Sequence, residues 1–362
     1  MLKPREAVLA VPLYHPPLAG REGLRLDFNE NTVGCSPRVL ERLRGLDPEQ
    51  LVKYPERGPA EGVVAGFLGV PADEVLLTNG VDEGIHLLCQ TYLEAGDEAV
   101  IVVPTYSMYR IYAMAAGAKV VEVAAGEDFS FPVEAVLERI SGKTRLICVA
   151  NPNNPTGSVA SREDLLRIAQ AAPDAALLVD EAYFEFYGQT MMGAWREVPN
   201  MFVARTFSKA YGMAGLRLGV LAGNAEQMKA VRRVASPYNV NAVALACVPE
   251  AIADQDYITE YVREVREGRE RLERTLEANG IQFWPSRANF VLMRVGLSKI
   301  DSANFVEAMR RRGILVRDRS SDHGCEGCVR ITLGPKEHVD RMLAALQEVV
   351  EELGIAQGAS RR

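Results

Sequence analysis

Short apolar runs alternate with longer helical segments from about residue 60 to residue 222, and this alternation constrains the fold most strongly. The runs lie at 98–103, 119–123, 145–150, 176–179, 201–206 and 216–222. Because these runs are mainly apolar over about five residues, they are expected to form strands buried on both faces. The pattern predicts an α/β fold with a mostly parallel central sheet between layers of helices.

The C-terminal part of the chain shows a second, smaller set of helices and strands. A long amphipathic helix is predicted from residue 257 to residue 279, where Gly280 ends it. The elements after it are strands at 289–294, 314–317 and 329–333 and helices near 303–311 and 336–353. With 362 residues, the chain is longer than one compact core usually requires. We therefore predict an extended, proline-rich N-terminal arm with part of the small domain over residues 1–45, a large domain over 46–250 and a small α/β domain over 251–362.

The charge balance and the N-terminal region exclude some classes of function. The formal net charge is −7, and the lysines and arginines form no basic block, which argues against a nucleic-acid partner. A signal peptide would need an apolar N-terminal run, and this region is interrupted by Pro4, Pro12, Pro16 and Pro17. No apolar run reaches membrane-spanning length. The sequence predicts a cytoplasmic protein without a membrane partner.

The cysteines are scattered and most have apolar neighbours, which is typical of buried free thiols in a reducing compartment. Cys325 and Cys328 stand three residues apart with His323 close by, as in half of a zinc site. A second ligand pair at the usual spacing is missing, so we predict no metal.

A lysine in a segment rich in glycine and hydroxyl residues is the first sign of chemistry. The segment from Thr206 to Gly219 places Lys209 directly after Ser208, and Arg217 follows eight positions later. An amine that attacks a carbonyl needs an enclosed site, and an anionic cofactor needs hydroxyl and guanidinium groups. Pyridoxal phosphate requires both, because a lysine binds its aldehyde and polar groups bind its phosphate. A lone Ser-Lys pair is more often a surface lysine in a Ser/Gly turn, so the other parts of the chain must support the cofactor site.

Polar residues follow two of the predicted strands. Asp180 comes directly after the run at 176–179, and Asn154 lies in the string Asn-Pro-Asn-Asn-Pro-Thr-Gly after the run at 145–150. A carboxylate that faces a pyridine nitrogen keeps the ring protonated, so Asp180 fits a pyridoxal phosphate site. Asn154 and Tyr183 could both bind the phenolic oxygen of that ring. By themselves, Asp180 is typical of a cap or turn, Asn154 of an Asn-Pro turn and Tyr183 of a half-buried tyrosine.

A glycine-led helix start offers a place for the phosphate. Gly80, Val81 and Asp82 precede a helical segment, so free backbone N–H groups there can face an anion. The predicted phosphate site is completed by Thr206, Ser208 and Arg217. Tyr106 follows a strand end and could stack on the ring, although a core or surface tyrosine would look the same.

Arg330 lies on a predicted strand among apolar neighbours. A guanidinium in that setting needs an anion, and the α-carboxylate of a substrate would bind it through two parallel hydrogen bonds. A structural salt bridge is the alternative.

Together, the motifs resemble the histidinol-phosphate aminotransferase branch of the class-II aminotransferases, which are fold-type I enzymes that use pyridoxal phosphate. The matching motifs are Asn29-Glu-Asn31, Lys53-Tyr54-Pro-Glu, Pro104-Thr-Tyr-Ser-Met-Tyr109, Asn151–Gly157, Asp180–Tyr183, Ser208-Lys209 and Arg330. The resemblance implies a pyridoxal phosphate-dependent transferase of fold type I, with a mostly parallel central sheet between helical layers and a smaller α/β second domain.

The resemblance also implies roles for single residues. Lys209 would bind the cofactor covalently and move the proton during the transfer. Asp180 would pair with the pyridine nitrogen, while Asn154 and Tyr183 would bind the phenolic oxygen. Asn154 and Arg330 would also contact the substrate.

The same resemblance implies a homodimer with shared active sites. Tyr54 would reach the cofactor phosphate of the partner subunit, and Tyr14 would close over the partner's substrate. Arg317 matches an arginine that binds a substrate phosphate in the family, but it could equally pair with Asp318 or Asp322.

The implied activity is amino transfer between a small-molecule amino donor and a 2-oxo acid acceptor. Histidinol phosphate and 2-oxoglutarate, in histidine biosynthesis, are the expected pair. The string Tyr14-His-Pro-Pro departs from the Tyr-x-Pro-Gly of many members. An aromatic or other amino acid is therefore an alternative donor, and threonine-phosphate decarboxylation is an alternative reaction.

Overall fold

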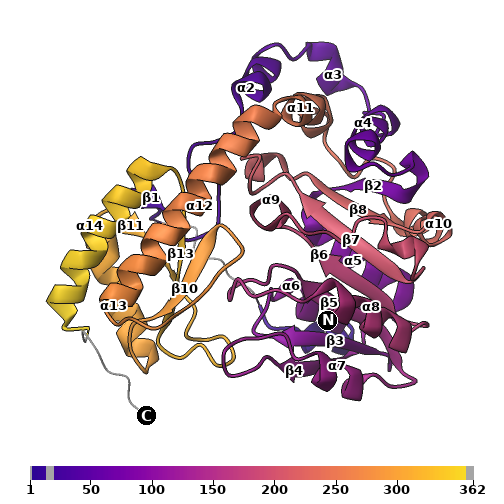
Figure 1. Cartoon of the computed structure of the whole chain (residues 1–362). Coiled ribbons are helices and arrows are strands. Elements are labelled where there is room, and N and C mark those ends of the chain that lie inside the picture. The colour runs from indigo at the N-terminus through magenta and orange to yellow at the C-terminus, as the bar shows by residue number, and fades with distance from the viewer. Residues whose placement is uncertain (1, 14–19, 356–362) are drawn as a thin grey trace.

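A computed structural model of the chain describes residues 2–13 and 20–355 (Figure 1). Tyr14, predicted to contact a substrate, lies outside the described residues. The arm is not extended throughout, because a short helix, α1 (Glu6–Leu9), forms in it. The four residues of this helix lie between Pro4 and Pro12, where no proline prevents a helical turn.

The largest element of the fold is a seven-stranded sheet. Its strand order is β2 (Val75–Thr78), β8 (Gly219–Gly223), β7 (Met201–Thr206), β6 (Ala176–Asp180), β5 (Thr144–Ala150), β3 (Glu98–Val103) and β4 (Lys119–Ala124). Strand β8 runs antiparallel to both of its neighbours, and all other neighbouring pairs are parallel. The prediction of a mostly parallel sheet is confirmed.

Strand β8 begins later than its apolar sequence predicts. The predicted strand covers 216–222, but Ala214–Leu216 form a 3-10 turn, η3, and Arg217 has a left-handed backbone with φ of 55°. A left-handed residue cannot continue an extended strand. The turn therefore delays the strand to Gly219.

The central strands β6, β7 and β8 are buried throughout, as expected for strands covered on both faces. The prediction fails for the edge strand β4, where only Val123 is buried. In β6, Leu177 and Val179 belong to one core cluster and Leu178 belongs to another. The cluster of Leu178 includes residues of α5 (Gly80–Tyr92), α6 (Met108–Ala116) and α10 (Ala225–Val234). The cluster on the opposite face includes residues of α4 (Gly58–Leu68), α7 (Val133–Arg139) and α8 (Arg162–Ala171).

A smaller, antiparallel sheet forms in the C-terminal part, drawn in orange and yellow beside the large sheet in Figure 1. Its strand order is β12 (Arg317–Asp318), β13 (Cys328–Thr332), β10 (Phe290–Arg294) and β9 (Phe283–Trp284). The helices of this part are α12 (Gln255–Ala278), α13 (Lys299–Arg311) and α14 (Lys336–Leu353). Strand β1 (Leu24–Arg25) pairs in parallel with β11 (Ile314–Leu315), which joins the N-terminal segment to this part. The domain boundaries near residues 45 and 250 stay a prediction.

The remaining helices are α2 (Pro37–Arg44), α3 (Pro48–Val52), η1 (Ala72–Glu74), α9 (Phe184–Tyr187), η2 (Ala194–Arg196) and α11 (Ala242–Ala253). None of the helices in the described residues is long and apolar enough to cross a membrane. Over the same residues, no group of three or more His, Cys, Asp or Glu side chains could bind a metal ion. Cys325 and Cys328 are free and buried.

Candidate active site

Several of the predicted site residues lie at the carboxyl ends of three neighbouring strands, β5, β6 and β7. Asp180 is the last residue of β6 and pairs with Ala150 of β5 and Ala204 of β7. Thr206 ends β7, and Lys209 follows it in the connecting loop. Because parallel strands end at the same edge of a sheet, the loops that follow them meet there. This edge is where open α/β sheets bind their ligands.

The Lys209 amine lies against the N-terminal segment of the chain. Its Nζ donates a hydrogen bond to the carbonyl oxygen of Phe28 at 3.0 Å and lies 6.0 Å from the centre of the Tyr183 ring. Burial lowers the pKa of Lys209 to about 8, and the positive charge of Arg330 acts in the same direction. A substantial fraction of this amine is therefore neutral near pH 8, as a nucleophile requires. An exposed lysine in a turn would not behave in this way.

Asp180 is a buried carboxylate with two hydrogen-bond donors. The Tyr109 hydroxyl donates to Oδ2 at 2.6 Å, and the Ala182 N–H donates to Oδ1 at 3.0 Å. Burial raises the pKa of Asp180 to about 6, while both hydrogen bonds lower it. The carboxylate is thus ionised at neutral pH in spite of its burial.

Tyr109 contacts the candidate site residue Asp180 and was not itself a candidate from the sequence. It was part of the motif that begins at Pro104, but no role was assigned to it. Its ring packs edge-to-face against Tyr106 with the ring centres 5.8 Å apart. The spacing of three residues between these tyrosines was the available signal, because residues three apart near a helix start share a face.

Groups that favour an anion lie together at the start of α5. Gly80 has φ of 74°, and a Cβ at this position would lie 2.6 Å from Nη2 of Arg217. Asp82 accepts hydrogen bonds from Arg217 at 3.1 Å and from the Tyr106 hydroxyl at 2.7 Å. The N-terminus of this 13-residue helix and the guanidinium both favour negative charge. Asp82 provides a negative charge there.

The other residues predicted to bind phosphate lie at the adjoining strand ends. The Ser208 N–H donates to Thr206 Oγ1 at 3.1 Å, and both side chains are buried. Val81 is the second residue of α5. A Cβ at Gly219 would lie 2.6 Å from the carbonyl carbon of Gly80, so the start of β8 touches the start of α5.

Arg330 is a buried cation whose described partners are neutral oxygens. It donates to Oδ1 of Asn154 and, at 2.7 Å, to the carbonyl oxygen of Asp27. Within the part of the chain that the structure describes, no carboxylate pairs with Arg330 and its Nε has no hydrogen-bond partner. Burial lowers the pKa of Arg330 to about 9, with a contribution from the positive charges of Arg319 and Arg317. The structural salt bridge considered as an alternative is not seen, and the arrangement favours an external anion.

Tyr183 lies between the two sheets. Its hydroxyl accepts a hydrogen bond from Nδ2 of Asn29 at 2.8 Å. Its ring packs edge-to-face on Phe290 of β10, with the ring centres 5.1 Å apart. The sequence motif Asn29-Glu-Asn31 includes Asn29, but it assigned no role to this residue. That motif was the only hint in the sequence that Asn29 lies at the candidate site.

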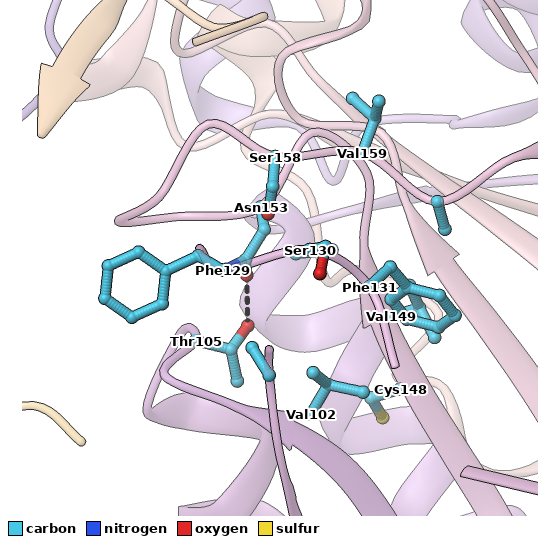
Figure 2. A pocket seen from close by; sticks show the side chains of 13 residues that line it. Val102, Thr105, Phe129, Ser130, Phe131, Cys148, Val149, Asn153, Ser158 and Val159 are labelled. Carbon is cyan, nitrogen blue, oxygen red and sulfur yellow. Dashed lines mark hydrogen bonds between the residues drawn. The ribbon is translucent and has the colours of Figure 1, made fainter. Parts of the chain in front are cut away.

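The loop of Asn154 is held in place by the neighbouring Asn153. Oδ1 of Asn153 accepts a hydrogen bond from the Thr105 hydroxyl at 2.7 Å, and its Nδ2 donates to the Pro104 carbonyl at 2.9 Å. Figure 2 shows Asn153 and Thr105 beside a small, mainly apolar cavity. The cavity lies between the ends of β3 and β5 and residues 129–131. None of the predicted site residues lines this cavity. The cavity therefore lies outside the candidate active site.

Arg317 lies near Arg330, and its predicted contact with a substrate stays a prediction. It begins β12 and pairs in register with Arg330 of β13. Its guanidinium lies 5.1 Å from the centre of the Phe28 ring. Among the described residues Arg317 forms no ion pair, and Asp322 pairs with Arg319 instead.

Tyr54 is not brought to Lys209 within this chain. Its side chain is 78% exposed and stacks on Tyr238 with the ring centres 4.4 Å apart. The predicted contact of Tyr54 with a partner subunit stays a prediction.

The sequence of this chain is similar to those of known proteins. The model of the family described as aminotransferase class I and II matches residues 21–346. The histidinol-phosphate aminotransferase of Caldanaerobacter subterraneus subsp. tengcongensis is 39% identical over 332 residues, which cover 90% of this chain and 93% of that protein. The histidinol-phosphate aminotransferase of Thermococcus gammatolerans is 36% identical over 333 residues, which cover 91% of this chain and 93% of that protein.

Solved structures share the fold. The histidinol-phosphate aminotransferase of Sinorhizobium meliloti in complex with pyridoxal 5'-phosphate has a TM-score of 0.87 at 27% identity, covering 96% of this chain and 97% of that chain. Aspartate aminotransferase from Thermus thermophilus with maleate has a TM-score of 0.81 at 24% identity, covering 96% of this chain and 100% of that chain. At this identity the match shows similarity of fold alone. These similarities confirm the predicted fold type I. Because the family match spans residues 21–346, this chain belongs to the aminotransferase class I and II family.

Proposed function

We propose that this chain is a pyridoxal phosphate-dependent aminotransferase that moves an amino group between histidinol phosphate and 2-oxoglutarate. The observation that carries the proposal is that three groups lie at the same edge of the large sheet. These are the Lys209 amine with its lowered pKa, the buried carboxylate of Asp180 and the anion-favouring start of α5. The relatives named histidinol-phosphate aminotransferase support the choice of substrate.

The start of α5 fits the phosphate of the cofactor. The phosphate would bind the backbone N–H groups of Gly80 and Val81 and the guanidinium of Arg217, which also pairs with Asp82 at 3.1 Å. The fit follows from the helix N-terminus and the arginine, which both favour an anion. Further phosphate ligands would be Thr206 and Ser208.

The ring of the cofactor would lie at the ends of β5 and β6. Asp180 would face the pyridine nitrogen, while Tyr183 and Asn154 would bind the phenolic oxygen and Tyr106 would flank the ring. When bound, pyridoxal phosphate supplies an aldehyde that takes up amino groups and a ring that accepts electrons from the substrate carbon. An ionised Asp180 favours the protonated form of the ring nitrogen.

Lys209 would bind the cofactor covalently and move the proton. Its hydrogen bond to the Phe28 carbonyl holds Nζ in place before the cofactor binds. The pKa of about 8 lets the displaced amine act as a base near neutral pH. In that role Nζ takes the proton from the substrate carbon that bears the amino group.

Two arginines supply positive charge for the anionic part of each substrate. Arg330 would bind the carboxylate of glutamate and 2-oxoglutarate, because its described partners include no carboxylate. Histidinol phosphate has no α-carboxylate, and its phosphate would face Arg330 together with Arg317. The two arginines lie in register on neighbouring strands, so both can face one anion.

The assembly and the location are also proposals. We propose a cytoplasmic homodimer with shared active sites, and we propose no nucleic-acid or membrane partner. The exposed ring of Tyr54 supports this assembly, since it is available to a second subunit. Tyr14 would close over the partner's substrate.

Substitution of Lys209 tests the function directly. Lys209→Ala should lose both the visible absorbance that pyridoxal phosphate gives with the wild-type protein and all amino transfer. Lys229→Ala is the matched control, because Lys229 forms a surface ion pair with Glu226 on α10. A Lys209→Ala protein that is coloured and active would refute the proposal.

A panel of donors separates the alternatives of substrate and reaction. Initial rates with 2-oxoglutarate should be highest for histidinol phosphate and lower for phenylalanine and aspartate. Higher rates with phenylalanine or aspartate would reassign the donor. Release of carbon dioxide from threonine phosphate without an acceptor would reassign the reaction to decarboxylation.

A further inference from the structure

Three consecutive residues of the N-terminal segment contact three groups of the proposed active site. The Asp27 carbonyl accepts from Arg330 at 2.7 Å, and the Phe28 carbonyl accepts from Lys209 at 3.0 Å. The next residue, Asn29, donates from Nδ2 to the Tyr183 hydroxyl at 2.8 Å. Asn29 differs from the other two because it uses its side chain, so its contact depends on residue type.

Asn29 is fixed in an unusual backbone conformation. It is 1% exposed and has φ of 55°, in the left-handed region that asparagine tolerates better than most residues. Its carbonyl oxygen accepts a hydrogen bond from Asn289 at 3.2 Å. Its N–H donates to Oγ1 of Thr332, the last residue of β13, at 3.0 Å. These contacts, far apart in sequence, hold the residue beside Tyr183.

The Thr332 hydroxyl sets the orientation of the Asn29 side-chain amide. Thr332 is fully buried. Among the described residues, its hydroxyl donates to Oδ1 of Asn29 at 3.1 Å. A buried hydroxyl proton needs an acceptor, so the oxygen end of the amide faces Thr332. The nitrogen end then faces Tyr183 and can only donate to it.

This orientation determines what the Tyr183 hydroxyl can do. Its oxygen accepts from Asn29, so its own proton must point to another acceptor, and the described residues provide none. Burial raises the pKa of Tyr183, which keeps the proton on the oxygen at neutral pH. The ring cannot turn away easily, because it packs on Phe290, the register partner of Thr332.

We propose that Thr332 and Asn29 are positioning residues that make Tyr183 a hydrogen-bond donor to the phenolic oxygen of the cofactor. The proposal rests on the proposed function, which places that oxygen beside Tyr183. A donor at this oxygen stabilises its ionised form. The relay from Thr332 through Asn29 to Tyr183 therefore sets the pH at which the absorbance of the bound cofactor changes.

The test measures that pH rather than activity. The visible absorbance of the protein loaded with pyridoxal phosphate is titrated, and the midpoint pH is compared between variants. Thr332→Val removes the hydroxyl with little change of shape, so the Asn29 amide is free to turn its oxygen toward Tyr183. The Tyr183 proton would then be donated to Asn29, and the midpoint should rise by roughly half a pH unit or more, as expected for one lost hydrogen bond. Thr332→Ser keeps the hydroxyl and should restore the wild-type midpoint.

A double-mutant comparison separates the relay from a general effect of the substitution. In the Tyr183→Phe background, Thr332→Val should cause no further shift, because the relay acts through the Tyr183 hydroxyl. If Thr332→Val does not fold, Asn29→Asp is measured with and without Tyr183→Phe. The negative charge that Asn29→Asp adds shifts the midpoint pH in both backgrounds. Only the additional shift seen when Tyr183 is present reports the relay.

The results distinguish a failed relay from a failed function. An unchanged midpoint in Thr332→Val, or equal shifts in both backgrounds, would overturn the relay while the cofactor assignment stands. Absence of a visible absorbance that depends on Lys209 in the wild-type protein would overturn the proposed function itself.

Discussion

The Tyr109 hydroxyl donates a 2.6 Å hydrogen bond to Oδ2 of Asp180, and this contact joins helix α6 to the end of strand β6. Both side chains are buried. Burial raises the pKa of Asp180 to about 6, and the bond from Tyr109 opposes that rise. The phenol thus keeps a buried carboxylate ionised at the position where the proposed site needs a negative charge.

Removing this hydroxyl should weaken activity most at low pH. Tyr109→Phe deletes a donor to a charged acceptor, so the pKa of Asp180 should rise further above 6. We expect kcat to fall about tenfold near pH 7, with a smaller loss at pH 8.5, since such a bond contributes about 1.5–3 kcal/mol. The measurement is the pH profile of kcat. Tyr92→Phe is the control, because its hydroxyl bonds Gln227 at 2.9 Å on another helix. Equal profiles for the two variants would contradict the role of Tyr109.

The ligand-free protein should become more stable when Asp180 loses its charge. The pKa of Asp180 is about 6 in the folded protein, against about 3.9 in an unfolded chain. Between these values the folded state binds more protons, so stability falls as the pH rises from about 4 to about 6 and stays lower above it. Asp180→Asn cannot ionise, and its free energy of unfolding at pH 7 should exceed the wild-type value by up to about 3 kcal/mol. Urea unfolding at pH 7 and pH 4.5 checks this, and a gain that does not shrink at pH 4.5 would contradict it.

The contact between β8 and α5 should be intolerant of a single methyl group. In Gly219→Ala, the new Cβ would lie 2.6 Å from the carbonyl carbon of Gly80 and 2.7 Å from the Val81 nitrogen. The start of α5 must shift, so the affinity for pyridoxal phosphate should fall by a factor of ten or more, about 1.4 kcal/mol. Gly66→Ala is the matched control, since its Cβ meets no atom within 4 Å on an exposed helix face. Titration of cofactor absorbance compares both, and equal affinities would contradict the prediction.

The buried ion pair behind Asp180 should be essential for stability. Glu181 accepts from Nε of Arg205 at 2.8 Å, and both side chains are almost fully buried. Arg205→Met leaves the Glu181 carboxylate buried without its partner, which should cost about 3–5 kcal/mol of unfolding free energy. Adding Glu181→Gln should recover part of the loss. Arg167→Met removes an exposed pair with Glu134 and should change stability by less than about 1 kcal/mol. Similar melting temperatures for Arg205→Met and Arg167→Met would refute the predicted difference in stability between the buried and the exposed ion pair.

Local patterns were sufficient to predict the architecture and the position of the proposed site. Continuous apolar runs such as that ending at Asp180 predict doubly buried strands, because this burial is encoded in neighbouring residues. Lys209 and Asp180 follow two adjacent strands, so their meeting at one sheet edge could be expected. The late start of β8 was not predicted, because the left-handed conformation of Arg217 depends on its contacts around Gly80 and Asp82.

The amino-acid sequence alone determined the α/β class, the mostly parallel character of the central sheet and the residue types available for cofactor chemistry. Only the tertiary structure decided which of these residues control one another: Tyr109 and Asp180 are 71 positions apart, and Asn29 and Thr332 are 303 positions apart. The same limit applies to Arg330, whose neutral partners come from Asn154 and Asp27. The physical reason is that apolar periodicity acts over a few residues, whereas hydrogen bonds and burial depend on chain segments that meet only after folding.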